Sequence, residues 1–407
     1  MGLLPVADAL ARVLASVAEP VETEEVALEA AAGRTLAADL RASRTQPPFA
    51  ASAMDGYAVR AADVASVPVR LRLVGRAVAG AGHRGTVGAG EAVRIFTGAP
   101  VPAGADAVVI QEDADLDGEH VLVREGAPAG RFVRPAGLDF RDGELLLRAG
   151  ERLDAPRLAL AAAMGHGRLP VRRRPRVAIL ATGDELVRPG EVAGPDQIVA
   201  SNPYALRAIV ERAGGEPVDL GIARDTLEDL ARRIAAARDA RADLLVTLGG
   251  ASVGEHDLVA EALGRDGLEL GFWRVAIRPG KPLMHGRLGR MLMLGLPGNP
   301  VSSIVCGILF VVPAIRALTG DPRAGEDSAE AGLLGRELPA NDGRQDYLRA
   351  GLACDGDGRL VATPERRQDS SMLAVLAASQ ALVVRPPHAP AARAGDPCRL
   401  IRLDRFS

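Results

Sequence analysis

Cysteine is scarce in this sequence. Its three cysteines, Cys306, Cys354 and Cys398, lie far apart and share no CxxC or histidine-paired spacing. The spacing therefore indicates neither a zinc site nor a disulfide framework. So little cysteine is typical of a protein in a reducing compartment, and we expect a cytoplasmic location.

Positive charge is not in excess either. The 49 Lys and Arg residues are outnumbered by 52 Asp and Glu residues, which gives a formal net charge of −3. An extended phosphate backbone is usually met by a basic surface, so the composition argues against a nucleic-acid partner. One basic cluster, at residues 172–176, is interrupted by Pro175 just before an expected strand. We interpret this cluster as a solvated domain junction.

The sequence also lacks an apolar run long enough to cross a membrane. The longest run, residues 304–315, is shorter than the roughly 20 residues that a spanning helix needs, and it contains Pro313. We expect a buried helix there. The first expected helix, residues 6–17, carries Asp8 and follows no basic segment, so it is not a signal peptide. No membrane partner is expected.

The 407 residues predict several domains. Short β-branched runs between residues 69 and 153 are separated by Gly, Pro and Asp turns, which is typical of β-hairpins. Helical patterns at 6–18 and 155–164 flank this stretch. We therefore expect an inserted β-rich domain at 46–144, within an N-terminal linker and helical-β domain formed by 1–45 plus 145–174.

After Pro175 strands and helices alternate strictly, which predicts βαβ units and a parallel sheet with helices on both faces. We assign a doubly wound α/β domain to residues 175–322. Beyond a polar linker the chain returns to strands, so residues 323–407 are expected to form a small C-terminal β-barrel domain.

Three expected strands of the α/β domain end in glycine-rich loops: ATGDE at 181–185, GGASVG at 249–254 and PGNP at 297–300. Ligands of open α/β sheets bind at the carboxyl ends of the strands, where backbone N–H groups form a nest for anions. Each loop alone is also ordinary turn chemistry. Together they predict a site for a phosphate-bearing ligand that includes Gly249, Gly250, Ser252, Pro297, Gly298 and Asn299.

Neither of two common phosphate-binding motifs, Walker A and GxGxxG, indicates a phosphate site in this sequence. There is no Walker A sequence. A GxGxxG match at 80–85 precedes a strand rather than a helix, so it is interpreted as a chance loop match.

Acidic residues follow the same strand ends. Glu185, Asp225 and Asp257 could hold a cation against a phosphate, and Mg²⁺ typically takes one or two carboxylates plus substrate oxygens. Magnesium is therefore the metal we expect. Helix capping is the alternative for Asp225, because the sequence DTLE resembles a capping box with Glu228 at its end. Both readings stay open, and they are compatible.

Two other turns carry notable charges. The loop RPGKP at 278–282 holds Arg278 and Lys281 in a stiff turn, which suits an oxyanion, although a solvated surface turn is the alternative. The turn SAMDGYA at 52–58 places Asp55 beside an aromatic residue. On its own, Asp-Gly is simply a good turn.

Taken jointly, these motifs resemble the MoeA family, whose eukaryotic relatives include the E domain of gephyrin. The resemblance is carried by PPFAASAMDGYAVR at 47–60, RIFTGAPVPAGADAVVIQE at 94–112, LATGDELVRPG at 180–190, LVTLGGASVGEHD at 245–257, RPGKPLMHG at 278–286 and LGLPGNPVSS at 294–303. It implies four domains, an α/β unit like that of the molybdopterin adenylyltransferases, and an elongated homodimer whose active site draws on both subunits. The implied activity is insertion of molybdate into adenylylated molybdopterin with release of AMP, the substrate being supplied by a molybdopterin adenylyltransferase.

The resemblance also implies roles for individual residues. The catalytic set it suggests is Asp55, Thr97, Glu185, Asp225, Asp257 and Lys281. Arg349 and Ser370 match by spacing an arginine and a serine that the family uses, and with Arg278 they are expected to gather molybdate. Arg278 stands where the family has a lysine, Asp369 where it has a glycine, and Ala51 where it often has an asparagine.

Two other functions compete with this one. Residues 175–320 alone resemble an adenylyltransferase, and a pterin-binding scaffold without catalysis is possible because the eukaryotic relatives also bind protein partners. The β-rich N-terminal half argues against the first alternative. Retention of every acid of the motif set favours catalysis over the second.

Overall fold

The alternation after Pro175 forms a doubly wound α/β domain, as the sequence predicts. The structure is a computed structural model that describes residues 3–250 and 258–406. Among these residues a six-stranded sheet has the spatial order β16 (Glu216–Ala223), β13 (Arg176–Thr182), β17 (Leu244–Leu248), β21 (Met291–Leu296), β20 (Met284–Leu288) and β18 (Glu269–Trp273). The first four strands are parallel, so their carboxyl ends lie at the same edge.

The last two strands, β20 and β18, run antiparallel to their neighbours. Strict alternation had predicted a parallel sheet, so the prediction is wrong for this edge. Only Gly289 and Arg290 connect β20 to β21. A parallel connection needs a crossover of roughly a dozen residues, so this short link forces a hairpin.

Both faces of the sheet are buried. In β13, Val177 and Ile179 join one hydrophobic core, while Ala178 and Leu180 join the other. The first core includes α1 (Val6–Ala15), α3 (Asn202–Ala213), α6 (Pro300–Cys306) and α7 (Val312–Leu318), and the second includes α4 (Leu227–Asp239) and α5 (Leu258–Arg265). Burial on both faces explains why these strands read as continuous apolar runs.

One helical run of the described residues, Pro300–Leu318, is long and apolar enough to cross a membrane by length and composition. It consists of α6, a π-helical segment at Gly307–Val311, and α7. Because 72% of it is buried inside the protein, it is a core helix of the α/β domain. The buried helix expected at residues 304–315 is confirmed.

The N-terminal segment contributes to two structural units, the α/β domain and a small unit of its own. Ala9 and Val13 of α1 are fully buried in the α/β core, although the sequence assigned this helix to the N-terminal unit. The chain then leaves through β1 (Thr23–Ala27), which pairs antiparallel with the returning β12 (Arg168–Arg172). Between them lies a small unit with its own core and with β2 (Leu40–Arg41), β11 (Leu145–Leu147) and α2 (Ala155–Ala163).

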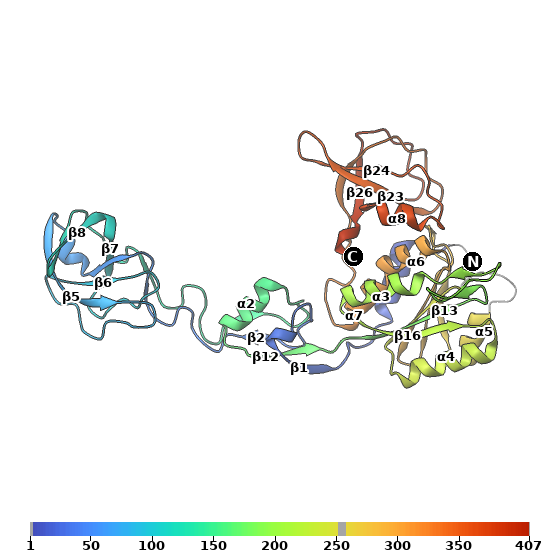
Figure 1. Ribbon diagram of the computed structural model, residues 1–407, viewed down its shortest axis with the longest axis horizontal. Coiled ribbons are helices and arrows are strands. Elements are labelled where there is room, and N and C mark those ends of the chain that lie inside the picture. Colours follow the sequence, from blue (N-terminus) through green and yellow to red (C-terminus); the bar gives the residue numbers. More distant parts are fainter. Residues whose placement is uncertain (1–2, 251–257, 407) are drawn as a thin grey trace.

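The β-rich insertion forms a separate domain. Its sheet has the order β7 (Ala107–Ile110), β4 (Gly56–Val59), β6 (Glu91–Ile95), β5 (Val69–Ala77), β9 (His120–Val123) and β8 (Ala114–Asp117). The molecule is elongated: this domain lies at one end of the long axis, the unit that carries α2 lies in the middle, and the α/β domain lies at the other end (Figure 1).

The C-terminal strands close into a barrel beside the α/β domain (Figure 1). The closed circuit runs β23 (Gln345–Cys354), β24 (Leu360–Pro364), β22 (Glu330–Leu334), β26 (Pro397–Arg402) and β25 (Ala381–Arg385), which pairs again with β23. A two-residue strand, β19 (Ile277–Arg278), pairs with β23 and so joins the 278–282 loop to the barrel. The short helix α8 (Leu373–Ala378) packs on the α6 side.

Candidate active site

The three glycine loops meet in one cleft at the carboxyl ends of the parallel strands. The cleft has a volume of about 950 Å³. It is lined by Thr182, Gly183 and Glu185 after β13, by Gly249 and Gly250 after β17, by Pro297, Gly298 and Asn299 after β21, and by Asp225 after β16. A pterin-sized ligand fits a cavity of this volume.

Two glycines allow the loops to pack against each other. Gly250 has a φ of +63°, and a Cβ there would lie 2.2 Å from Cγ2 of Val259. Gly249 has a φ of +98°, and its Cβ would lie 2.8 Å from the backbone oxygen of Thr182. Side chains are therefore excluded at both positions, which leaves the backbone open to the cleft.

The first residue of α3 fixes the third loop. The Asn202 side-chain amide donates to the carbonyl oxygen of Gly298 at 2.6 Å. The loop that ends β21 is thereby attached to the helix that begins beside it.

The acids near β13 and β16 repel one another. The backbone N–H of Asp225 donates to Oδ1 of Asp184 at 3.2 Å. Withdrawal from water raises the pKa of Asp225, and the nearby carboxylates of Asp184 and Glu185 raise it further. A cation bound here would relieve this repulsion.

Capping does not account for Asp225. The N-cap of α4 is Thr226, whose hydroxyl oxygen accepts from the backbone N–H of Asp229 at 3.3 Å. Asp229 in turn accepts from the N–H of Arg224 at 2.9 Å. Capping therefore begins at Thr226, one residue later than the sequence suggested, and Asp225, which lines the cleft, is not the N-cap.

Two expected residues, Ser252 and Asp257, lie outside the described residues. Within the described part of the chain, no three or more His, Cys, Asp or Glu side chains form a group that could hold a metal ion. Among the described residues, Glu185 and Asp225 are the two carboxylates that line the cleft. Two carboxylates suit Mg²⁺ completed by substrate oxygens and water.

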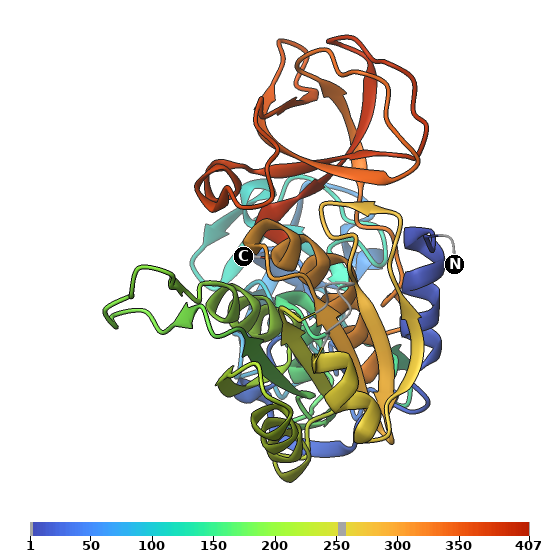
Figure 2. The same cartoon turned by 90° about the vertical axis from the view of Figure 1, so that its right-hand side faces the viewer.

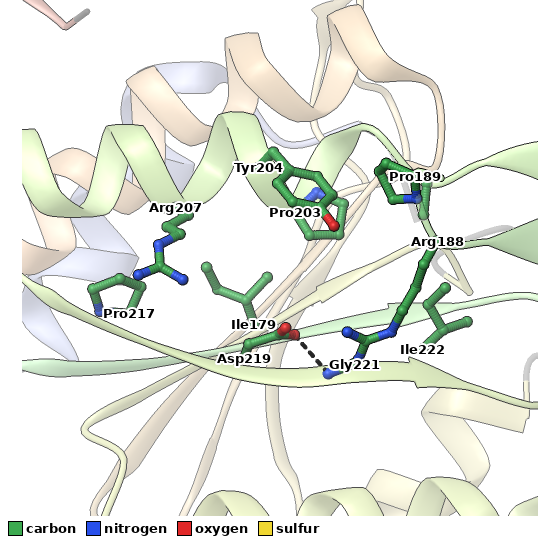
Figure 3. A pocket seen from close by; sticks show the side chains of 11 residues that line it. Ile179, Arg188, Pro189, Pro203, Tyr204, Arg207, Pro217, Asp219, Gly221 and Ile222 are labelled. Carbon is green, nitrogen blue, oxygen red and sulfur yellow. Dashed lines mark hydrogen bonds between the residues drawn. The ribbon is translucent and has the colours of Figure 1, made fainter. Parts of the chain in front are cut away.

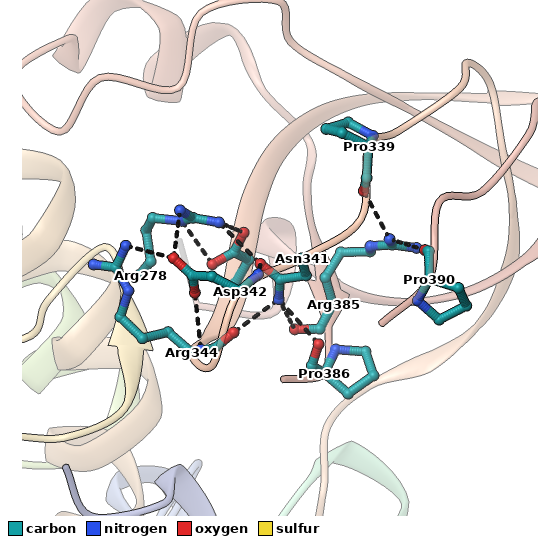
Figure 4. A network of polar contacts seen from close by, with 9 residues as sticks. Arg278, Pro339, Asn341, Asp342, Arg344, Arg385, Pro386 and Pro390 are labelled. Atoms are coloured by element: carbon teal, nitrogen blue, oxygen red, sulfur yellow. Dashed lines mark hydrogen bonds and ion pairs between the residues drawn. The ribbon is translucent and has the colours of Figure 1, made fainter. Parts of the chain in front are cut away.

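The two positively charged residues of the loop at 278–282, Arg278 and Lys281, have different surroundings. Arg278 donates from Nε to Oδ1 of Asp346 at 2.7 Å and from Nη2 to Oδ1 of Asn341 at 2.9 Å (Figure 4 shows the surrounding network). The hydrogen bond to Asp346 raises the pKa of Arg278. The guanidinium therefore ties the loop to the barrel and does not line the cleft, where an oxyanion role had been expected.

Lys281 is placed differently. It is exposed, and it forms no ion pair within the part of the chain that the structure describes. The next residue, Pro282, lines the cleft. Gly280 has a φ of +117°, and a Cβ there would lie 2.5 Å from Sγ of Cys306, so the turn packs closely on α6.

The barrel contributes a loop to the rim of the cleft. Asn299 donates from Nδ2 to the hydroxyl of Ser370 at 2.9 Å, and Ser371 lines the cleft directly. Asp369 accepts from both the N–H and the hydroxyl of Ser371, at 2.8 and 2.6 Å. The aspartate that departs from the family pattern therefore closes the turn that presents Ser370.

Arg349 is a buried residue that holds the loop carrying Ser370 in place. It is only 1% exposed, and its guanidinium donates to the carbonyl oxygens of Met372 at 3.1 Å and Arg367 at 3.2 Å. Protein atoms cover its guanidinium in this arrangement, so its expected contact with molybdate stays a prediction. In this chain it positions the loop that carries Ser370.

Asp55 and Thr97 lie together, but not in the cleft. Oδ1 of Asp55 accepts from the N–H of Thr97 at 2.8 Å and from its hydroxyl at 2.7 Å. These two hydrogen bonds lower the pKa of Asp55, and the positive charge of Arg94 contributes as well. Both residues belong to the β-rich domain. This domain lies at the opposite end of the molecule's long axis from the α/β domain, which carries the cleft (Figure 1).

A second hollow lies between β16 and α3, lined by Arg188, Tyr204 and Arg207 (Figure 3). Its volume is about 50 Å³. It is far smaller than the cleft and too small for a pterin. The larger cleft is therefore the candidate site.

The sequence did not single out Thr182, Asp184 or Ser371, which belong to the cleft region. Thr182 and Asp184 stand in the ATGDE loop beside Glu185, so their position after a strand was the available signal. Ser371 carried no local signal, because only folding of the barrel brings it to the α/β domain.

Comparisons with known proteins agree along the whole chain. Residues 4–165 match the MoeA N-terminal region (domain I and II), residues 178–317 a probable molybdopterin binding domain, and residues 331–403 the MoeA C-terminal region (domain IV). A molybdopterin molybdenumtransferase of Haemophilus influenzae is 32% identical over 94% of both chains. One of Nostoc sp. is 39% identical over 81% of this chain and 77% of its own.

Solved structures give the same result. A molybdopterin biosynthesis MoeA protein from Pyrococcus horikoshii is similar with a TM-score of 0.84 and 28% identity, covering 98% of this chain and 99% of its own. A second structure of such a protein, with 32% identity and the same coverage, has a TM-score of 0.81.

Proposed function

Because this chain belongs to the MoeA family of molybdenum cofactor biosynthesis, we propose that it transfers molybdenum from molybdate to adenylylated molybdopterin and releases AMP. Its relatives are named molybdopterin molybdenumtransferases, and the chain covers most of their length. The observation that carries the proposal is the cleft itself, where glycine loops, two acids and the Ser370 loop converge.

The substrate's phosphates are assigned to the glycine loops. The N–H of Gly249 donates to the carbonyl oxygen of Leu296 at 3.1 Å, so the groups proposed to meet the phosphates are the backbone N–H groups of Gly250 and Gly298, which line the cleft. The pterin then occupies the remaining volume towards the barrel, where Ser371 and Leu373 line the cleft.

Magnesium fits the acidic side of the cleft. Glu185 and Asp225 would hold it, and the pKa of Asp225 is raised first by withdrawal from water and then by the neighbouring carboxylates of Asp184 and Glu185, which a cation would neutralise. When bound, the ion would neutralise charge on the pyrophosphate link. Asp257 is a third expected ligand, at a position that the structure does not describe.

Molybdate is assigned to the opposite side of the cleft. Lys281 offers an exposed positive charge next to Pro282, and Ser370 offers a hydroxyl. The two pterin thiols displace one oxo group of molybdate, which leaves as water with the thiol protons. Hydrolysis of the phosphoanhydride consumes one water and gives AMP and the molybdopterin phosphate, so the two steps balance.

The active site is proposed to be shared by two subunits of a homodimer. Asp55 is half-buried and Thr97 is exposed, and both belong to the β-rich domain at the far end of the molecule, so a partner's cleft is the place where they could orient the metal or the water. A molybdopterin adenylyltransferase is the proposed donor of the substrate, and the cytoplasm is the proposed location.

The test is incubation of the purified protein with adenylylated molybdopterin, molybdate and Mg²⁺. We expect AMP to appear together with protein-bound molybdenum cofactor. An adenylyltransferase would instead consume ATP and release pyrophosphate, and a scaffold would bind the pterin without forming AMP. Either result would contradict the proposal.

A further inference from the structure

The floor of the cleft contains a buried hydroxyl without a partner. Thr182, the last residue of β13, is only 5% exposed and lines the cleft. Its Oγ1 has no hydrogen-bond partner among the described residues. Buried hydroxyl groups in native proteins are nearly always hydrogen-bonded, so this exception requires an explanation.

The glycine loop after β17 packs directly against this hydroxyl. A Cβ on Gly249 would lie 3.1 Å from Thr182 Oγ1, and a Cβ on Gly250 would lie 3.2 Å from it. Both neighbours are glycines, so on that side only the loop backbone, and no side chain, shields the hydroxyl. The hydroxyl and the backbone of residues 249 and 250 therefore lie together in the floor of the cleft.

Valine would fill the same space as threonine without placing an unpaired polar group in the protein interior. Valine also favours β-strands, as the rest of β13 and β17 illustrates. An unsatisfied hydroxyl in this position destabilises the free protein. Such local costs are typical of functional sites, where the missing partner is a ligand.

We propose that Thr182 contacts the substrate and donates its hydroxyl hydrogen to a phosphate oxygen of the adenylylated pterin. A phosphate is favoured over the pterin ring because the adjacent glycine loop at Gly250 is the proposed anion nest, and Glu185, a proposed metal ligand, lies three residues after Thr182. This inference rests on the proposed function and adds a residue to its binding site.

The chain provides a matched control. Thr247 in β17 also has an unpartnered Oγ1 and is 1% exposed, but it does not line the cleft. It pairs in register with Leu180, two residues before Thr182, so both threonines belong to the same face of the sheet. Only Thr182 should affect the ligand.

The test compares Thr182→Val, Thr182→Ser and Thr247→Val by thermal unfolding and by direct binding of adenylylated molybdopterin, with inorganic pyrophosphate as a second probe. Both valine variants should raise Tm by about 2–4 °C, because each removes an unpaired buried hydroxyl. Thr182→Val should also weaken binding of both probes about 10-fold or more, because a hydrogen bond to a charged group is lost. Thr182→Ser and Thr247→Val should bind normally.

Three outcomes would contradict the proposal. Unchanged binding by Thr182→Val would remove the hydroxyl from the ligand site, and a lowered Tm would mean that the hydroxyl has a structural partner. Loss of pterin binding with normal pyrophosphate binding would move the contact from the phosphates to the ring and would likewise contradict the proposal. These readouts need no turnover, so they remain valid even if the wild-type protein fails to release AMP.

Discussion

Lys281 is the only lysine of the chain, among 49 Lys and Arg residues. Arginine occupies every other such position, including 278, where the family has lysine. A guanidinium is a planar fork, whereas an ammonium is a compact point charge on a flexible stem. The retention of lysine at the exposed end of this loop therefore indicates that a compact cation is needed there.

We predict that Lys281→Arg keeps the fold but raises the KM for molybdate about tenfold, because the larger head group changes the geometry of oxyanion binding. The measurement is AMP release at varied molybdate concentrations. Arg290→Lys, in the exposed turn between β20 and β21, is the control and should change nothing. Normal kinetics for Lys281→Arg would show that any positive charge suffices.

Asp225 gives a prediction with a defined pH dependence. Its pKa in the folded protein is raised above the ordinary 3.8, so the folded state binds the proton more tightly than the unfolded state. The charged carboxylate therefore lowers stability above the folded-state pKa, and this effect disappears as the pH falls towards 3.8. Asp225→Asn should have a higher Tm than wild type at pH 7 without metal, and an equal Tm near pH 3.8.

The same variant tests the metal. Mg²⁺ with substrate should stabilise the wild type more than Asp225→Asn, and AMP release should fall on the order of 100-fold in the variant. Thermal unfolding with and without Mg²⁺ is the measurement. A variant that is less stable than wild type at pH 7 would mean that the carboxylate is paired in the folded state.

At the scale of elements, the sequence predicted the features that depend on the local pattern of residues. Alternating strands and helices, glycine loops at strand ends and turn-separated hairpins gave the α/β domain and the β-rich domain. The antiparallel edge was missed because its decisive feature is the two-residue link at Gly289 and Arg290. The capping register at Thr226 was missed because two successive residues can both cap a helix.

Contacts between distant segments were not predictable in this way. Arg278 pairs with Asp346, 68 residues later, and Arg349 is buried beneath a loop that closes only when the barrel forms. Both are arginines in a chain rich in arginine, so residue type carried little information about their contacts. From the sequence alone, positively charged residues near a proposed oxyanion site were interpreted as its ligands. In the structure, Arg278 and Arg349 hold loops in place.

The glycine loop after β17 gives an element-scale prediction. Gly250→Ala should lower Tm by several degrees and reduce substrate affinity, because the new Cβ meets Val259 and φ is positive. Gly90→Ala has a similar φ of +72° but nothing within 4 Å, so it measures backbone strain alone. Equal effects in the two variants would show that loop packing at position 250 is unimportant. Differential scanning calorimetry and substrate titration are the measurements.

At the scale of the whole molecule, the β-rich domain, which carries Asp55 and Thr97, lies at the opposite end of the long axis from the α/β domain, which carries the cleft (Figure 1). The green segment between β14 (Leu186–Val187) and β15 (Ile198–Val199) projects from the α/β domain in Figure 2, and Val192 within it is 96% exposed. The first feature is the reason for proposing a site that two subunits share.

Subunit mixing tests this organisation. Asp55→Ala and Lys281→Ala should each be inactive, but randomly mixed dimers should regain about a quarter of wild-type AMP release, because about half are heterodimers with one intact site. The activity of separately purified variants, before and after mixing under exchange conditions, is the measurement. A mixture that stays inactive while exchange is verified would place both residues in a site within one chain.

The paired strands β1 and β12 have a mechanical consequence. Their five residue pairs, from Thr23 with Arg172 to Ala27 with Arg168, form the base of a long arm that ends in the β-rich domain. Lengthening both strands by two residues would shift everything beyond them by about 7 Å, more than twice the length of a hydrogen bond. We therefore expect natural insertions to be tolerated at the tip of the arm and to be rare at its base. On the proposed function, the length of the β1–β12 pair sets the distance between the β-rich domain and the cleft it serves.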